Sequence, residues 1–530
     1  MRQSFCSKLL CIVALSVVTA FTFACGSAIT HPAIESSVAS TSNPLVAQVS
    51  VVSGCVGQAM VEFGPDTSYG RSTSWYAVPG KYQPTTIFVA GMRASTTYHL
   101  RSQTQCSGIT ESVASPDMTF ATGPIPSSVP LPKLTVSRPT PSSSSPENSG
   151  IEMITVPSGG VPAFFTDRDG NPIWYYSTGQ NNSPYVFKLL PNGNIIVMVT
   201  TNPVGTTVGI SSIREIDLAG NLIRELDIST LDQRMQAAGF DFAPDNFTHD
   251  LVPLDNGHVI VLVNYSKTLT GLIGYSGSQT VVGDGLVDLD ENWNPVWAWT
   301  SFDHLDVNRH LSGLPDWTHG NGVAYSPVDG NLFLSLRHQS WVLKIDYSYG
   351  TGTGNILWHL GYQGDLALTV NGVPTTDPSE WFSFQHFPVF ISQSGPITTL
   401  GVWDNGDNRV LNPEGVICGP PPVYNVPCHS RANIFQIDDN AKTADLAWSD
   451  SPGFYSLWGG NMNQLPNGNV EFDANSPIGP TGLITGSIVQ EVTQTATPQV
   501  VWQMDVGPTT LNAYRAYRYP SLYNGVTWQY

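Results

Sequence analysis

The sequence predicts an all-β protein, a six-bladed β-propeller preceded by a small β-sandwich. Two repeated strand patterns and a near absence of helical periodicity predict this fold. In the first pattern a turn containing Gly leads into an apolar strand, most clearly at residues 190–197 and 465–470. Asn-Gly between apolar runs is the strongest short-range signal of a β-hairpin.

A second hairpin pattern alternates with the first. It consists of a strand, a turn and a strand that ends in an apolar residue, usually Trp, and it occurs at residues 167–174, 217–226, 288–297, 346–358, 438–448 and 490–502. Two hairpins per unit and six units describe a propeller with four-stranded blades. We therefore assign residues 151–530 to the propeller and expect residues 514–530 to close the ring with the first blade.

The composition agrees with an all-β chain. Only 12% of the 530 residues are charged, and only residues 231–238 suggest a helical period. The length can bury a large core and fits two folded domains. The net charge of −19 argues against nucleic acid or an anionic membrane surface as a partner, because both require clustered Lys and Arg.

The N-terminus, residues 1–24, reads as a signal peptide. Arg2 and Lys8 supply its basic end, and residues 9–23 form an apolar stretch that is too short for a comfortable membrane span. The segment resembles a bacterial lipoprotein signal, in which Cys25 would be lipidated and would anchor the protein. Ordinary cleavage near Ala28 is the alternative. Either way we expect an exported protein, periplasmic or anchored to the outer membrane as a lipoprotein.

Residues 45–123 predict a separate small domain. Strand-like runs at 59–63, 86–89 and 97–101 follow one another in an order that resembles a fibronectin type III sandwich, with spacing, docking or homodimer contacts as its expected role. Residues 124–150, rich in Ser and Pro, predict a linker, of which 131–136 can pack as an edge strand.

Four cysteines remain after the N-terminal segment. They allow three pairings, and the local one, Cys55 with Cys106 and Cys418 with Cys428, is favoured. Disulfides are typical of exported proteins. A metal site is the competing interpretation, but the Cys-x-x-Cys spacing that would favour zinc is absent.

Three histidines occupy nearly the same place in three copies of the first pattern. His249, His319 and His386 lie 8, 11 and 9 residues before the turn glycine, and the other copies offer Tyr185 and Asn461 there. Equivalent positions in a closed repeat converge on one axis, so these side chains should meet. Arg337 lies on the strand that returns to the same rim. A single histidine before a strand is usually structural, but this set indicates a shared anion-handling or catalytic role.

The ordered motifs resemble the bacterial arylsulfate sulfotransferases over roughly residues 150–525. The motifs are His249-Asp250, Trp317-x-His319-x-Asn321, Ser335-x-Arg337-His338, Gln385-His386 and Asp404-Asn405-Gly406-x-x-Arg409. The resemblance implies a six-bladed propeller and ping-pong transfer of a sulfuryl group between phenols through a sulfohistidine, without a nucleotide donor, cofactor or metal. It also implies a short disulfide, here Cys418–Cys428, near the active site.

The same resemblance assigns roles residue by residue. His386 corresponds to the nucleophile, and His249, His319 and Arg337 to catalytic positions around the sulfuryl group. Asn321 corresponds to a sulfuryl-binding position, and we expect Thr318 and Trp317 to contact substrate as well. The expected partners are small phenols and aryl sulfates.

The chemistry of the residues agrees with this assignment. An anionic nucleophile would be repelled by a sulfate ester, whereas neutral imidazole, with an unperturbed pKa of roughly 6.5, is not. Two alternatives stay open: a metal-dependent propeller hydrolase that uses the three histidines as ligands, and a non-catalytic surface-binding propeller. The fixed charge of Arg337 argues against a neighbouring cation.

Overall fold

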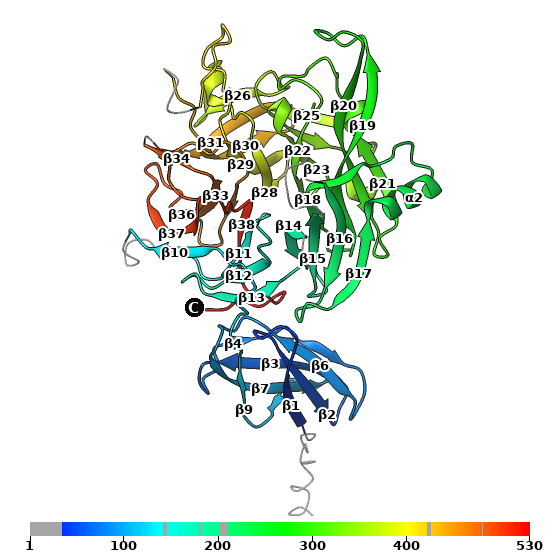
Figure 1. Ribbon diagram of the computed structural model, residues 1–530, viewed down its shortest axis with the longest axis vertical. Helices are drawn as coiled ribbons and strands as arrows, with labels where there is room; N and C mark the ends of the chain where they lie inside the picture. The colour runs from blue at the N-terminus through cyan, green and yellow to red at the C-terminus, as the bar shows by residue number, and fades with distance from the viewer. Residues whose placement is uncertain are drawn as a thin grey trace, which may run out of the picture.

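A computed structural model describes residues 34–140, 146–157, 159–179, 182–200, 209–420, 426–479 and 481–529. These residues form antiparallel sheets and very little helix, which confirms the predicted all-β class (Figure 1). The predicted signal peptide, Cys25 and Ala28 lie outside the described residues. Among the described residues, no helix is both long and apolar enough to span a membrane.

The N-terminal part consists of two sheets that face each other. One has the order β1 (Ile34–Ser40), β2 (Ala47–Ser53), β6 (Pro84–Val89). In the other, β3 (Gly57–Gly64) and β7 (Thr97–Cys106) pair and are flanked by β4 (Arg71–Ser72), β5 (Tyr76–Val78), β8 (Ser112–Ala114) and β9 (Met118–Ala121). Burial alternates along β2 and β7, as it does when one face of each sheet lies on a core. The first strand begins at Ile34, ahead of the predicted boundary at residue 45.

The predicted local pairing of the cysteines is present. One disulfide joins Cys55 to Cys106 in the N-terminal sheets, and the other joins Cys418 to Cys428. Two disulfides fit an exported protein, since thiols are kept reduced in most cytoplasms.

The remaining described strands form six antiparallel units of four strands. The first unit has β11 (Ile151–Thr155), β12 (Ala163–Thr166), β13 (Pro172–Tyr176) and the last strand of the chain, β38 (Arg515–Tyr519). The second has β14 (Ser183–Leu189), β15 (Ile195–Thr200), β16 (Ile210–Ile216) and β17 (Leu222–Asp227), and the third has β18 (Asn246–Pro253), β19 (Val259–Thr270), β20 (Ser278–Leu289) and β21 (Pro295–Thr300). A single residue pair, Ile210 with Phe247, joins these two units.

The last three units follow in chain order. The fourth has β22 (Gly320–Tyr325), β23 (Leu332–Leu336), β24 (Trp341–Ile345) and β25 (Ile356–Leu360). The fifth has β28 (His386–Ser394), β29 (Ile397–Asp404), β30 (Arg431–Asp438) and β31 (Thr443–Asp450), and the sixth has β32 (Asn461–Gln464), β33 (Val470–Asn475), β36 (Ser487–Val492) and β37 (Val500–Gly507). Shorter strands extend this set: β26 (Ala367–Val370), β27 (Val373–Pro374), β34 (Ile478–Gly479) and β35 (Gly482–Leu483).

The first strands of the six units touch one another in cyclic order. Strand β11 contacts β14, then β18, β22, β28 and β32 follow, and β32 contacts β38. Strand β38 pairs with β11 along five residues, from Ile151 opposite Tyr519 to Thr155 opposite Arg515. Figure 1 shows β11, β14, β18, β22, β28 and β38 near the middle of the larger lobe. Residues at the beginnings of these strands are therefore brought together, and the C-terminal segment pairs with the first unit.

Two weaker sequence signals also correspond to elements. The helical period at residues 231–238 falls within α2 (Ile228–Ala238), which Asp227 caps and Gly239 ends in the left-handed conformation. The predicted edge strand in the linker is β10 (Lys133–Ser137), which pairs with β37 at the edge of the sixth unit.

The end of the chain attaches the N-terminal sheets to the larger lobe. Trp528 packs edge-on against Phe63 at 5.6 Å between ring centroids and donates a hydrogen bond from Nε1 to the carbonyl of Ser72. The hydroxyl of Tyr523 donates to the carbonyl of Phe88. The core of the N-terminal sheets therefore continues into the C-terminal segment.

Candidate functional site

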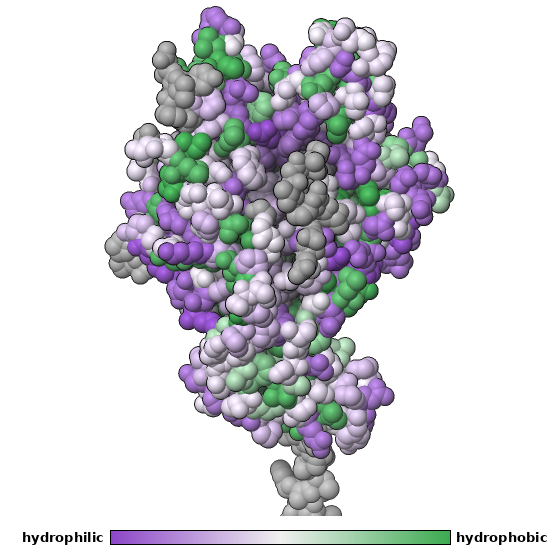
Figure 2. Space-filling model, viewed as in Figure 1, coloured by the Kyte–Doolittle hydropathy of each residue, from purple (hydrophilic) through white to green (hydrophobic). Residues whose placement is uncertain are grey.

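The structure brings the three repeat-phase histidines to one place. The ring centroids of His249 and His319 are 4.7 Å apart, and Tyr514 lies 6.1 Å from His249 and 6.3 Å from His386. His249 lies in β18, His319 lies immediately before β22, and His386 begins β28. On the face of the molecule that Figure 2 shows, hydrophilic residues gather in the hollow between the two projections of the larger lobe.

A β-bulge at the same point of each strand aims these side chains. The pairing register shifts between Phe247 and Leu251, between Gly320 and Gly322, and between His386 and Pro388. His249 and His319 themselves have φ values of 41° and 51°, in the left-handed region that few L residues adopt. Such strain collects at functional sites, and a bulge re-aims a side chain.

The tautomer of His386 follows from its hydrogen bonds. The amide of Asn405 donates to the carbonyls of Ser456 at 2.7 Å and Gly459 at 3.1 Å, so its Oδ1 faces His386 Nδ1 at 2.6 Å. Nδ1 therefore carries the proton, and Nε2 keeps its lone pair. The N–H of Gly459 donates to that Nε2 at 3.2 Å.

His386 is also held neutral. Only 2% of the residue is exposed, and burial lowers its pKa well below the usual range, with the charges of Arg337 and Arg515 adding to the effect. Burial and the neighbouring His319 lower the pKa of His249 in the same direction. An uncharged imidazole with an unprotonated Nε2 is what attack on a sulfate ester requires.

His319 has a carboxylate partner. Its Nδ1 lies 2.6 Å from Asp316 Oδ2, and its ring stacks on that of His338 at 4.5 Å. Burial opposes ionisation of Asp316, but the hydrogen bond and charge of His319, with the nearby His338, lower its pKa to about 2. The ionised Asp316 can compensate a positive charge on His319, which suits a proton donor and acceptor.

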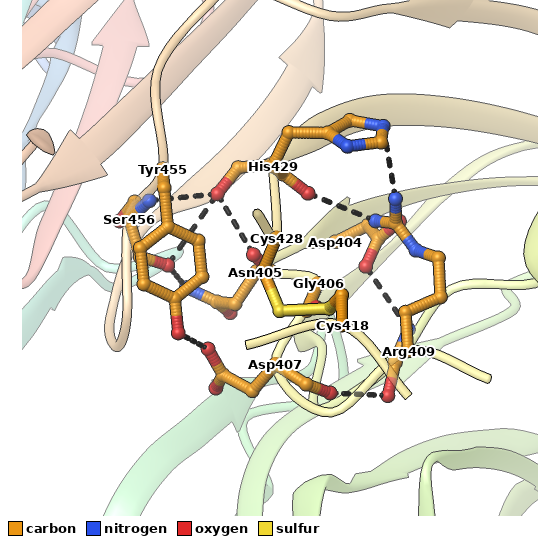
Figure 3. Close-up of a disulfide and its surroundings, with 12 residues drawn as sticks. Asp404, Asn405, Gly406, Asp407, Arg409, Cys418, Cys428, His429, Tyr455 and Ser456 are labelled. Atoms are coloured by element: carbon orange, nitrogen blue, oxygen red, sulfur yellow. Dashed lines mark hydrogen bonds and ion pairs between the residues drawn. A yellow bond between two sulfur atoms is a disulfide. The ribbon is translucent and has the colours of Figure 1, made fainter. Parts of the chain in front are cut away.

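Arg337 lies beside these rings, in the 3₁₀ turn (Arg337–Gln339) that follows β23. It donates to Asp407 Oδ2 at 2.7 Å, to the carbonyl of Leu457 at 3.1 Å and to His338 Nε2 at 3.0 Å, while its Nε is buried without a hydrogen-bond partner. Burial raises the pKa of Asp407 to about 7, against the opposing charge of Arg337 and the hydrogen bond from Tyr455 that Figure 3 shows. The Nε of Arg337 therefore remains a hydrogen-bond donor that an anion could use.

Three site residues did not emerge as functional candidates from the motifs: Tyr185, Tyr514 and Arg515. Tyr185 stands edge-on to His249 at 5.8 Å and lies 4.7 Å from Tyr514. Arg515 is fully buried and donates only to oxygens of Gly460, Tyr514 and Asn321. In the described part of the chain no carboxylate lies within 4 Å of Arg515. Tyr185 occupied the histidine position of its own repeat, whereas Tyr514 and Arg515 belong to no repeated turn.

The other predicted residues make hydrogen bonds that hold the segments carrying the histidines. Asn321 donates from Nδ2 to the carbonyl of Gln385 at 2.8 Å, and its Oδ1 is buried without a partner. Thr318 donates to Asp284 at 2.6 Å, and Trp317 donates from Nε1 to the carbonyl of Arg309 at 2.9 Å. Thr318 and Trp317 have no exposed surface, and their hydrogen bonds hold the segment that carries His319; their contact with substrate stays a prediction.

A metal site is the alternative use of this cluster. Ligand atoms of Asp316, His319 and His338 lie within 4.8 Å of one another. Both ring nitrogens of His338 are already bonded, Nδ1 to the carbonyl of Asp316 at 2.7 Å and Nε2 to Arg337. The fixed charges of Arg337, which is partly exposed, and of the buried Arg515 favour an anion over a cation.

The disulfide Cys418–Cys428 stands next to Asn405 (Figure 3). Two residues after Cys428, Ser430 donates its hydroxyl to the carbonyl of Asn405 at 2.8 Å. In the same region Arg409 forms a salt bridge with Asp404, with 2.6 Å between Nη2 and Oδ2. The disulfide therefore fixes the chain that positions the partner of His386.

Removing this disulfide should lower activity before it unfolds the protein. The bridge closes a loop with a sequence separation of 10, so its loss should cost about 2–3 kcal/mol of stability. Comparison of Cys418→Ser/Cys428→Ser with Cys55→Ser/Cys106→Ser, by turnover and thermal unfolding, separates the two effects. The first pair should lose turnover at temperatures where it remains folded and the second should not; equal losses would contradict the assignment.

Comparison with known proteins agrees with the class of site. The site of this all-β chain combines a neutral buried histidine with Arg337, which is paired with Asp407, and Arg515, which has no carboxylate within 4 Å among the described residues. Residues 156–518 match the family described as Arylsulfotransferase (ASST), and the chain belongs to this family. A curated relative, the arylsulfate sulfotransferase AssT of Escherichia coli O6:H1 (strain CFT073), is 28% identical over 151 residues, 25% of this chain and 22% of the relative's length.

Solved structures resemble the chain only distantly. A protein of unknown function from Bacteroides caccae has 9% identity and a TM-score of 0.37, with 70% of this chain and 98% of that chain covered. Hydrazine synthase of Kuenenia stuttgartiensis has 12% identity and a TM-score of 0.29, with 60% and 64% covered. Similarities of this size do not bear on function.

Proposed function

We propose that this protein is an arylsulfate sulfotransferase, which moves a sulfuryl group from a phenolic sulfate ester to a phenol through a sulfohistidine at His386. The transfer needs no nucleotide donor, cofactor or metal. The observation that carries the proposal is the state of His386: buried and neutral, with its proton on Nδ1 and the Nε2 lone pair meeting only the N–H of Gly459, while the charges of Arg337 and Arg515 help to keep its pKa low. Membership of the arylsulfotransferase family supports the substrate class.

The proposed architecture is a six-bladed propeller over residues 151–530, with a fibronectin type III-like sandwich at 45–123 and a linker at 124–150. The cyclic contacts of the first strands and the pairing of β38 with β11 support it. We place the protein in the periplasm, or at the outer membrane through lipidated Cys25.

In the first half-reaction, His386 Nε2 attacks the sulfur of the donor. The N–S bond forms as the S–O bond to the aryl group breaks, and the aryl oxygen leaves with the electron pair. The sulfur takes the position at Nε2 that the N–H of Gly459 occupies through a 3.2 Å hydrogen bond. The non-bridging oxygens keep their negative charge throughout, so fixed donors such as Arg337 stabilise the transition state without reorganisation.

His319 supplies and then removes the proton. As an imidazolium balanced by Asp316, it protonates the departing phenolate, whose pKa is roughly 10. The neutral imidazole then takes the proton of the acceptor phenol. The acceptor oxygen attacks the sulfur, the S–N bond breaks, and its electron pair returns to Nε2. The cycle restores every protonation state.

The decisive assay uses purified protein with a chromogenic aryl sulfate, with and without an added phenol, in the presence of a chelator. We expect phenol-dependent release of the chromophore and a newly sulfated acceptor, with no loss in chelator. Chelator-sensitive hydrolysis that ignores the acceptor would favour a metal-dependent hydrolase instead. The absence of any turnover would favour a binding protein.

The first half-reaction should stay fast at mildly acidic pH. The pKa of His386 is lowered well below roughly 6.5, so the nucleophile remains unprotonated until the pH falls through that lowered value. An aryl sulfate with a good leaving group, such as 4-nitrophenyl sulfate, needs no proton from His319 and isolates this step. Its burst rate, measured by stopped flow, should be flat from about pH 8 to 6. A fall centred near the unperturbed value would refute a buried neutral nucleophile.

A further inference from the structure

A pocket of about 460 Å³ lies beside the histidine site, among loops of the fourth and fifth units. Phe382, Phe384 and Tyr362 supply apolar walls, and Leu311 and Ile417, which are 55% and 52% exposed, stand at its rim. Its volume lies within the range of small-molecule sites, about 300–1,000 Å³, and suits a two-ring compound.

Phe384 forms the wall that the pocket shares with the site. It lies two residues before His386, its ring is 5.8 Å from that of His338, and the guanidinium of Arg337 lies 5.0 Å from the ring centroid. Ser340, also in the lining, accepts the N–H of Phe384 and donates its own N–H to the carbonyl of Arg337. A ring in the pocket is therefore adjacent to the groups that hold the sulfuryl oxygens.

The pocket contains a cation without a carboxylate partner. Arg309 lies over the ring of Trp341 at 3.5 Å and donates to the backbone and side-chain oxygens of Gln339 at 2.8 and 2.7 Å. Among the described residues no carboxylate lies within 4 Å of it, and burial lowers its pKa to about 10. The second cation in the lining, Arg409, is paired with Asp404 at 2.6 Å.

We propose that this pocket binds the aryl part of an extended phenolic substrate that carries a carboxylate remote from its hydroxyl group, with the carboxylate paired to Arg309. The inference rests on the proposed function and specifies its substrate class. Charge-assisted hydrogen bonds to a planar guanidinium fork are the strong kind, and the apolar walls take the rings. Glu414, the one acidic residue in the lining, is exposed and not within 4 Å of Arg309, so it does not occupy the cation.

Binding tests the pocket without requiring turnover. The probes are biphenyl-4-carboxylate, which has no hydroxyl group to sulfate, and its neutral isostere biphenyl-4-carboxamide, titrated calorimetrically into the full chain. Arg309→Gln should weaken binding of the carboxylate about 10–100-fold and that of the carboxamide less than about threefold. Arg234→Gln is the matched control, because Arg234, like Arg309, has no carboxylate within 4 Å among the described residues; it donates to backbone carbonyls and lies on α2, outside the pocket lining. It should leave both affinities unchanged.

Leu311→Trp is the second variant, placed at the exposed rim so that folding does not depend on it. It should fill the pocket and weaken both probes together. Undiminished binding of the carboxylate to folded Arg309→Gln, or to Leu311→Trp if the arginine variant does not fold, would overturn the proposal. Binding that follows this pattern in a protein without sulfuryl transfer would instead leave the pocket in place and refute the proposed function.

Discussion

Replacing His386 with alanine should abolish the first half-reaction. With an aryl sulfate and no acceptor, the wild-type protein should release a burst of phenol and gain about 80 Da, the mass of one SO₃ group, whereas His386→Ala should do neither. The reason is that His386 is buried and neutral and carries its proton on Nδ1, so that its Nε2 keeps a lone pair for attack. Rapid-quench release of phenol and mass spectrometry of the intact protein measure the two outcomes.

Two control variants show which histidine carries the SO₃ group. His258→Ala removes a histidine that is paired with Asp288 in the third unit, and it should label normally. His249→Ala should be slow but labelled, because His249 has a lowered pKa and serves the sulfuryl group without bonding to it. A mass gain that persists in His386→Ala, or a label mapped to His249 or His319, would move the covalent step to another imidazole.

The similar spacing of His249, His319 and His386 from the turn glycine of their repeats predicted that the three side chains lie close together. This spacing is set by the lengths of strands and turns, which the local sequence determines. The three histidines lie within β18, immediately before β22 and at the first residue of β28, and these strands touch in cyclic order. The same regularity placed Tyr185 at an equivalent position. The all-β class, the edge strand β10 and the helix α2 were predictable for the same reason, since hydrophobic period and turn residues decide them.

The residues that surround His386 from distant parts of the chain could not be predicted from such local patterns. Asn405 and Gly459 fix the tautomer of His386 from the fifth unit and the loop before the sixth, and Arg515 arrives on the last strand of the chain. No local period marks such residues. Thr318 and Trp317 show the converse: they lie beside His319 in sequence, but both side chains are fully buried among other parts of the protein.

The contact between the N-terminal sheets and the end of the chain is a second case. Trp528 and Tyr523 fall in a segment without strand periodicity, yet they complete the core of sheets that begin some 490 residues earlier. The parallel pairing of β26 with β31 is similar, because β26 belongs to an insertion whose place depends on the fifth unit and not on its own sequence.

Arg337→Ala should lower the rate of sulfuryl transfer by about 10²–10³ and still become labelled at His386, since the loss of one fixed donor weakens the transition state but leaves the nucleophile. Arg337→Lys should recover only part of the rate, because an ammonium keeps the charge and lacks the planar fork. The fold should tolerate both changes: burial already holds the pKa of Asp407 at about 7, so without Arg337 this carboxyl takes up a proton and no unpaired charge stays buried.

Single-turnover rates of phenol release and the mass of the intact protein test whether Arg337 acts as a donor to the sulfuryl oxygens and His386 as the nucleophile. Arg234→Ala serves as the control for loss of a guanidinium that contacts only carbonyls away from the site. A folded Arg337→Ala protein that never gains the mass of SO₃ would show that Arg337 is required for the covalent step itself. A rate within about threefold of wild type would show that Arg515 alone supplies the positive charge.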